Sequence, residues 1–269
     1  MSTMSTMKEL PRWVWRRAGA AALAYGMWCA IVAPAAEAQR GRGRGGPTIL
    51  PNVPYDGRFT YIRVRYDIPM DGGFRGQDVK WAHDYPRGEQ HFAKVMSELS
   101  TIRIHTAGSN ILTLDDPQLT KYPVAFITEP GFWRPNDQEV LGLRNYLLKG
   151  GFVIFDDFAG EHWMNFEAQI RKVLPKLTPI LLTIDHPLFD SFYKIKNLDY
   201  YHPYYQGFKS EFYGIFEDNN PKKRLMAVVN FNNDISEYWE FSDQGMFPMD
   251  ASNEAYKLGV NYIIYALTR

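Results

Sequence analysis

The sequence of 269 residues contains one cysteine, Cys29, and equal numbers of basic and acidic residues, 30 of each. A single cysteine excludes an intramolecular disulfide and any zinc or iron–sulfur site built from several thiolates. The balanced charge gives no overall positive field, so no nucleic-acid partner is expected. The sequence also lacks a glycine-rich phosphate loop, a serine nucleophile elbow and a dinucleotide-binding fingerprint. These absences exclude several common classes of enzyme.

The first 38 residues have the pattern of a secretory signal peptide. A basic segment over residues 12–17 precedes an uncharged apolar run over residues 18–33. This run is shorter than the about 20 apolar residues of a membrane-spanning helix, although an uncleaved anchor is the alternative interpretation. The Ala-Glu-Ala sequence at 36–38 has the small residues that signal peptidase recognises, which predicts cleavage before Gln39. We therefore expect export to the periplasm or the medium, and a mature chain without cysteine or transmembrane helix.

Residues 39–54 are expected to form a linker, because alternating arginine and glycine residues cannot pack into a core. Residues 55–269 then form one domain, in which apolar runs of strand length alternate with helical periodicity. The expected strands cover residues 59–66, 101–106, 122–128, 152–155 and 179–184, and the expected helices cover 88–99, 136–149, 161–174 and 253–267. Continuous apolar strands separated by helices indicate an α/β domain with a mostly parallel sheet. Three short segments, at 212–216, 224–231 and 237–241, predict antiparallel additions toward the C-terminus.

Acidic and histidine residues follow several of these strands. Open α/β sheets bind ligands beyond the carboxyl ends of their strands. The candidate ligand-binding residues are therefore Asp67, Glu129, Asp156, Asp157, Glu161, His162, Asp185 and His186. Carboxylates grouped with imidazoles suit three roles, which are to bind a divalent cation, to act as an acid–base pair on a sugar, or to hydrogen-bond a polyol. The sequence assigns no catalytic residue, and a divalent cation is the one cofactor that it leaves open.

Each of these candidates also has a purely structural interpretation. The acidic pair at 156–157 would cap the next helix, and Glu129 would organise a turn. The Asp-His-Pro sequence at 185–187 is typical of a turn before proline. Glu161 and His162 are neighbours and would face different sides of a helix, so they would not share one metal ion.

Five short motifs are distributed along the domain: Thr113–Pro117, Thr128–Phe132, Gly150–Phe158, Asp185–Pro187 and Gly259–Tyr262. Together they resemble the bacterial domain of unknown function 4159 family, and the resemblance covers about residues 59–268. That family resembles the class I glutamine amidotransferase-like superfamily, which implies a flavodoxin-like three-layer sandwich. In active amidotransferases, a tight elbow after the equivalent strand carries a nucleophilic cysteine. This sequence has Asp156 and Asp157 there.

The missing nucleophile predicts that glutaminase and cysteine-peptidase activities are absent. The resemblance then implies an exported binding or assembly module without catalysis, and family members encoded beside membrane proteins imply a cell-envelope protein complex. The alternative is a carboxylate- or metal-dependent hydrolase of a carbohydrate or envelope polymer, using Asp156, Asp157 and Glu129. That alternative requires the three carboxylates to converge with one of them protonated. An aromatic segment at 200–205 is a further candidate for contact with a carbohydrate or a protein.

Overall fold

The structure is a computed structural model, and it describes residues 48–68, 79–200, 202–205 and 207–269. The chain divides into two units, at 1–46 and 47–269. The predicted signal peptide, its cleavage point before Gln39 and the first part of the predicted linker lie outside the described residues. Within the described ranges, no helix has both the length and the apolar character needed to cross a membrane.

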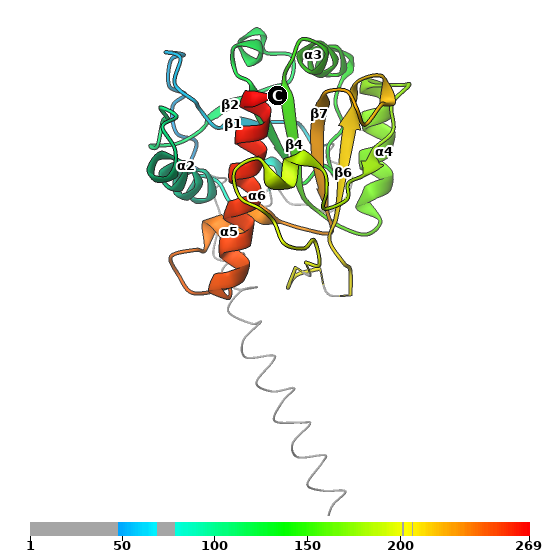
Figure 1. Cartoon of the computed structure of the whole chain (residues 1–269). Coiled ribbons are helices and arrows are strands. Elements are labelled where there is room, and N and C mark those ends of the chain that lie inside the picture. The colour runs from blue at the N-terminus through cyan, green and yellow to red at the C-terminus, as the bar shows by residue number, and fades with distance from the viewer. Residues whose placement is uncertain (1–47, 69–78, 201, 206) are drawn as a thin grey trace, which may run out of the picture. The chain divides into compact units, whose positions relative to one another are not determined.

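A seven-stranded mixed sheet forms the centre of the second unit (Figure 1). In the order in which they pair, its strands are β2 (Asn110–Leu112), β1 (Ile62–Val64), β3 (Val124–Thr128), β4 (Phe152–Phe158), β7 (Leu225–Phe231), β6 (Glu211–Phe216) and β5 (Ile180–Leu181). The strands from β2 to β7 run parallel, while β6 is antiparallel to both of its neighbours. The predicted α/β class, with antiparallel strands toward the C-terminus, is confirmed.

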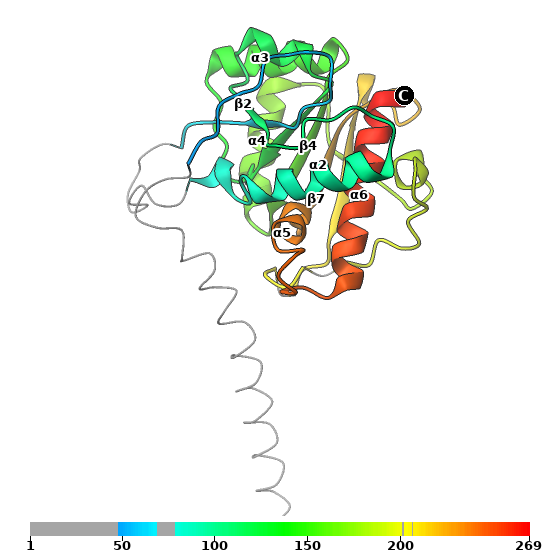
Figure 2. The ribbon, with the colours of Figure 1, turned by 90° about the vertical axis from the view of Figure 1, so that its left-hand side faces the viewer.

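Helices cover both faces of this sheet (Figure 2). One face carries α2 (Arg87–Leu99), α5 (Ile235–Glu240) and α6 (Met249–Thr268), and the other carries α3 (Asp137–Leu148) and α4 (His162–Val173). Every residue of β3 and β4 is buried, as expected of parallel strands enclosed on both sides. Their side chains alternate between two cores. Phe155 packs against Phe166 of α4, whereas Phe152 packs against Tyr265 of α6.

Helix α3 begins at the predicted cap. Asn136 Oδ1 accepts hydrogen bonds from the backbone N–H groups of Gln138 and Glu139, at 2.9 and 3.0 Å. Glu139 Oε2 in turn accepts the backbone N–H of Asn136 at 2.9 Å. This reciprocal arrangement satisfies N–H groups that have no partner within the helix, so the start of α3 is fixed by local sequence alone.

Two predicted strands are wrong. Residues 101–106 contain only an isolated bridge, between Ile104 and Phe59, and the strand beside β1 is β2. All three residues of β2 are buried, whereas residues 101–106 are exposed or half-buried, so burial decides which segment pairs. Residues 237–241 mostly belong to helix α5, because Asp234 Oδ1 accepts the backbone N–H of Glu237 at 2.9 Å and caps that helix.

The last part of the predicted linker contacts the sheet. Asn52 Nδ2 donates to the backbone carbonyl of Ile111 at 2.9 Å, and the backbone N–H of Ile111 donates to Asn52 Oδ1 at 2.8 Å. The backbone N–H of Val53 also donates to Asn110 Oδ1 at 2.7 Å. The side chain of Asn52 therefore hydrogen-bonds to the outer edge of β2 as the backbone of a neighbouring strand would.

Candidate functional site

Two acidic residues lie at the carboxyl ends of the neighbouring strands β3 and β4. Glu129 directly follows β3, and Asp157 is the last residue but one of β4. Both have a left-handed backbone, with φ angles of 51° and 63°. This conformation costs a non-glycine residue about 1 kcal/mol or more and persists only where the surroundings impose it. For Asp157 the cause is an irregularity between Phe155 and Phe158, where the register of β4 against β7 shifts.

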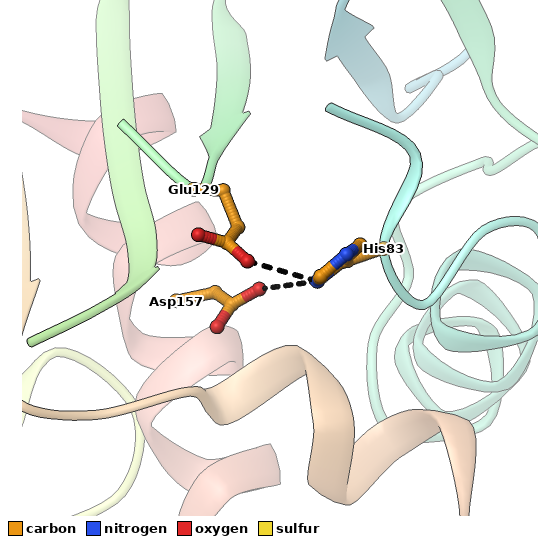
Figure 3. Close-up of side chains that lie close together, drawn as sticks. All are labelled: His83, Glu129 and Asp157. Carbon is orange, nitrogen blue, oxygen red and sulfur yellow. Dashed lines mark hydrogen bonds and ion pairs between the residues drawn. The ribbon is translucent and has the colours of Figure 1, made fainter. Parts of the chain in front are cut away.

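The two carboxylates meet at one imidazole (Figure 3). His83 Nδ1 lies 3.1 Å from Asp157 Oδ2 and 3.2 Å from Glu129 Oε1. His83 follows the short helix η1 (Lys80–Ala82), so it approaches the strand ends from a different part of the chain. We call His83, Glu129 and Asp157 the acid–histidine centre.

Two further side chains bind the carboxylates of this centre. Lys80 Nζ lies 3.1 Å from Glu129 Oε1 and 4.5 Å from the centroid of the Phe132 ring. Tyr205 donates its hydroxyl hydrogen to Asp157 Oδ1 at 2.5 Å. Both oxygens of Asp157 therefore have a partner, one in His83 and one in Tyr205.

The two carboxyl groups differ in their affinity for a proton. Burial and the negative charge of Asp157 raise the pKa of Glu129 to about 8, although the charges of His83 and Lys80 act against this shift. Burial also disfavours ionisation of Asp157. However, the hydrogen bond and charge of His83, with the hydrogen bond from Tyr205, hold the pKa of Asp157 below its ordinary value. The surroundings thus favour the protonated form of Glu129 and the ionised form of Asp157, a combination that suits acid–base chemistry.

Asp156 points away from the centre. Its Oδ1 accepts hydrogen bonds from Asn230 Nδ2 at 2.9 Å and from the backbone N–H of Ile235 at 3.3 Å. Its Oδ2 accepts the backbone N–H and the hydroxyl of Ser236, at 3.1 and 3.0 Å. These four donors hold the Asp156 carboxylate at the start of α5, and it is not part of the acid–histidine centre. The prediction that this acidic pair caps the next helix is wrong, because α4 has no side-chain cap and Asp156 instead accepts N–H groups at the start of α5.

Among the other predicted residues, His162 lies beside the centre. Its ring packs against Phe132, with 4.7 Å between the ring centroids. Burial and the positive charge of Lys80 lower the pKa of His162. Asp67 and Glu161 are exposed and do not belong to the acid–histidine centre.

Asp185 and His186 are not brought to the centre. His186 Nδ1 accepts the backbone N–H of Leu188 at 3.2 Å, and its ring lies 5.6 Å from Phe216 and 5.9 Å from Tyr265. Phe216 ends β6, which runs antiparallel to β7. This contact therefore lies at the opposite end of the strands from Asp157. Strand β5 has only two residues, and the chain turns back after it. The alternative interpretation of this segment as a turn before proline fits the structure.

Three residues that contact the predicted acids were not predicted from the sequence: Lys80, His83 and Tyr205. His83 has no second histidine at metal-binding spacing, so no local pattern singled it out. Tyr205 belongs to the aromatic segment 200–205, which was predicted to contact a partner rather than Asp157. These contacts join segments distant in sequence, so only the folded chain shows them.

A second group of buried acids lies next to the centre. One oxygen from each of Asp84, Asp157 and Asp234 lies within 4.8 Å of the other two. Ser236 donates its hydroxyl to Asp84 Oδ2 at 2.8 Å. Burial, with the negative charges nearby, raises the pKa of Asp234 well above its ordinary value and the pKa of Glu237 to about 10. Asp157 belongs both to this group and to the acid–histidine centre, and either group has the number of ligands needed to hold a cation.

Comparison with known families gives one result for this domain. The sequence profile of a domain of unknown function, DUF4159, matches residues 60–267. The chain belongs to the DUF4159 family. No protein with a curated description matches the chain. The match includes His83, Glu129 and Asp157, so the acid–histidine centre lies within the DUF4159 domain.

Proposed function

We propose that this DUF4159 protein is an exported binding module whose ligand is held at the acid–histidine centre. The supporting observation is that two strained acidic residues, Glu129 and Asp157, are both directed at His83. Backbone strain of this kind is typical of functional sites. The centre also lies at the carboxyl ends of parallel strands, where open α/β sheets bind their ligands.

The conformation of Asp157 supports a role in binding rather than in covalent catalysis. Its left-handed backbone at the end of β4 fits the elbow of an amidotransferase-like fold, with a carboxylate in place of the thiol. Both carboxylate oxygens already accept a hydrogen bond or an ion pair, from Tyr205 and His83. A carboxylate held in this way is a poor nucleophile, so the proposed module has the shape of the superfamily without its reaction.

The proposed ligand is a carbohydrate or another polyhydroxylated component of the cell envelope. The centre offers an ionised acceptor in Asp157 and a cationic donor in Lys80. The rings of Phe132 and His162 lie beside these polar groups, and such rings stack on the apolar faces of sugars. Export agrees with an envelope ligand, and rests on the leader pattern of residues 1–38.

A second candidate function is a hydrolase that acts on a carbohydrate or envelope polymer. It is favoured by the convergence of the Glu129 and Asp157 carboxyl groups on one side of His83. Two carboxyl groups in opposite protonation states are the usual components of such a reaction. Asp156 would take no part, because its oxygens are bonded at the start of α5.

The test is a binding and turnover screen of residues 39–269 against cell-wall glycan fragments, in buffer containing EDTA. We expect saturable binding without product, at least tenfold weaker in Asp157→Asn and unchanged in the exposed control Asp185→Asn. Product release that Glu129→Gln abolishes would decide for the hydrolase. Failure of every fragment to bind would contradict both functions.

Export is tested by expressing the whole chain in a bacterial host and sequencing the N-terminus of the protein recovered outside the cytoplasm. The proposal expects Gln39 as the first residue. A full-length chain retained in the membrane fraction would instead support the uncleaved anchor.

A further inference from the structure

We propose that the acid–histidine centre binds one divalent transition-metal ion, with His83 Nδ1, Glu129 Oε1 and Asp157 Oδ2 as its protein ligands. This inference rests on the assignment of the centre as the binding site. It holds whether or not the protein also catalyses a reaction.

The spacing of the three donor atoms supports this proposal (Figure 3). The imidazole nitrogen lies 3.1 Å from the Asp157 oxygen and 3.2 Å from the Glu129 oxygen, and all three atoms lie within 4.8 Å of one another. Ligands at about 2.1 Å from a metal ion are about 3.0 Å apart in octahedral geometry and about 3.4 Å apart in tetrahedral geometry. The two nitrogen–oxygen separations therefore match those of neighbouring ligands in one coordination sphere.

The kinds of donor atom select the class of ion. Calcium and magnesium take oxygen ligands, whereas zinc, manganese, iron and nickel accept imidazole together with carboxylate. One histidine and two acids on three separate segments also form an open set, which leaves positions for water or for an oxygen of the ligand.

A neighbouring carboxylate gives independent support. Asp84 is fully buried, and its Oδ1 accepts no hydrogen bond from an amide, ammonium, ring or hydroxyl donor of the described residues. An oxygen of Asp84 lies within 4.8 Å of one of Asp157. A buried acidic group is stabilised by positive charge nearby, so Asp84 favours a cation at Asp157.

Lys80 provides a sharp test of the proposal. Its ammonium lies 3.1 Å from the Glu129 oxygen that would bind the ion, so the two cations compete for one carboxylate. Replacing Lys80 by methionine keeps an unbranched apolar chain over the Phe132 ring and removes the competing charge. The proposal therefore predicts tighter metal binding by Lys80→Met, by a factor of about ten, which a merely damaged fold would not produce.

The experiment titrates Zn²⁺, Mn²⁺, Co²⁺ and Ca²⁺ into residues 39–269 that have been freed of metal by a chelator, without any sugar present. Calorimetry and elemental analysis should give one ion per chain, and the visible spectrum of bound Co²⁺ should indicate one nitrogen ligand. His83→Gln and Asp157→Asn should each weaken binding at least tenfold. The matched control is His105→Gln, because His105 pairs with Asp56 away from the centre.

Several outcomes would overturn the metal site. They are no binding of any ion, unchanged affinity in His83→Gln, or tighter binding of Ca²⁺ than of Zn²⁺, which would place the ion in the oxygen-only group of Asp84 and Asp234. Near-UV circular dichroism checks that each variant is folded. The glycan screen is run in EDTA, which removes metal ions. Glycan binding in that screen, with no metal binding in this titration, would refute the metal site and leave the proposed function standing.

Discussion

At the scale of single residues, the adjacent acids Asp156 and Asp157 have different tasks. Every group around the Asp156 carboxylate is a donor, namely the amide of Asn230 and the N–H and hydroxyl groups at the start of α5. Asp157 is bonded by an imidazole and a phenol, and each can reverse its hydrogen bond. The same substitution should therefore have different effects at the two positions.

We expect Asp156→Asn to lower the free energy of unfolding by about 2 kcal/mol, because its amide N–H would face N–H donors. Asp157→Asn should change that free energy by less than about 1 kcal/mol, since asparagine also tolerates the left-handed backbone found there. Urea denaturation of the two variants beside wild type checks this. Equal losses at both positions would contradict the division of tasks.

His202 predicts how stability depends on pH. Burial lowers the pKa of His202 to about 4, against the charges of Asp157 and Asp84. The ordinary value is 6.5, so the unfolded chain gains this proton first as the pH falls. Stability from this group is present above pH 6.5 and is lost between about 6.5 and 4, by about 2 kcal/mol from pH 7 to pH 5.

The variant His202→Asn isolates this effect, because its side-chain oxygen can replace Nδ1 in accepting the backbone N–H of Tyr204. The free energy of unfolding should fall less between pH 7 and pH 5 in the variant than in wild type. If the free energy of unfolding fell equally in both proteins, His202 would gain its proton as readily in the folded protein as in the unfolded chain.

The residue scale also shows which part of the site could be predicted. Glu129 and Asp157 follow apolar strands, and a general rule about parallel sheets brings them to one edge. That rule does not say which way a side chain points, so it could not separate Asp157 from Asp156. His83 joins the centre through a contact between segments 46 and 74 residues apart, which no local pattern encodes.

At the scale of elements, the prediction was right where local hydrogen bonds determine the element and wrong where packing against the rest of the chain determines it. The capping box starts α3 without help from the rest of the chain. Residues 101–106 have the pattern of a strand, but β2 pairs with β1 in their place, because the side chains of β2 are buried. The short helix α5 depends on Asp234 and on Asp156 from a distant strand, so its sequence alone resembled a strand.

Helix α3 provides a prediction at this scale through Gly142. Alanine is normally preferred over glycine inside a helix by about 1 kcal/mol. Here a Cβ atom would lie 2.0 Å from the backbone carbonyl oxygen of Leu114, and a backbone atom cannot move aside cheaply. We expect Gly142→Ala to lower the free energy of unfolding by more than about 2 kcal/mol, measured by urea denaturation.

The control lies in the same helix. Asn145 is exposed, so Asn145→Ala should leave stability unchanged or raise it slightly. If the two alanine variants were equally stable, α3 would not pack on the Leu114 carbonyl as described.

At the scale of the whole molecule, the two cores share one sheet. Trp133 packs near Phe155 in the core beneath α3 and α4, and Trp239 stacks on Phe92 in the core beneath α2 and α6. Because β3 and β4 supply side chains to both cores in alternation, neither core can open without exposing the strands of the other.

We therefore expect both tryptophans to report one unfolding transition. Residues 39–269 labelled with 5-fluorotryptophan would give separate ¹⁹F signals, assigned with Trp133→Phe and Trp239→Phe. The two signals should have the same urea midpoint. Different midpoints would show that one helical layer detaches before the other.

The contact of Asn52 with Ile111 has a consequence for association between copies. A sheet edge with free N–H and carbonyl groups can add a strand from another chain and so start aggregation. Asn52 occupies both backbone groups of Ile111 on the outer edge of β2, and the opposite edge is the two-residue β5. Once folded, the domain would thus offer neighbouring copies little template for polymerisation.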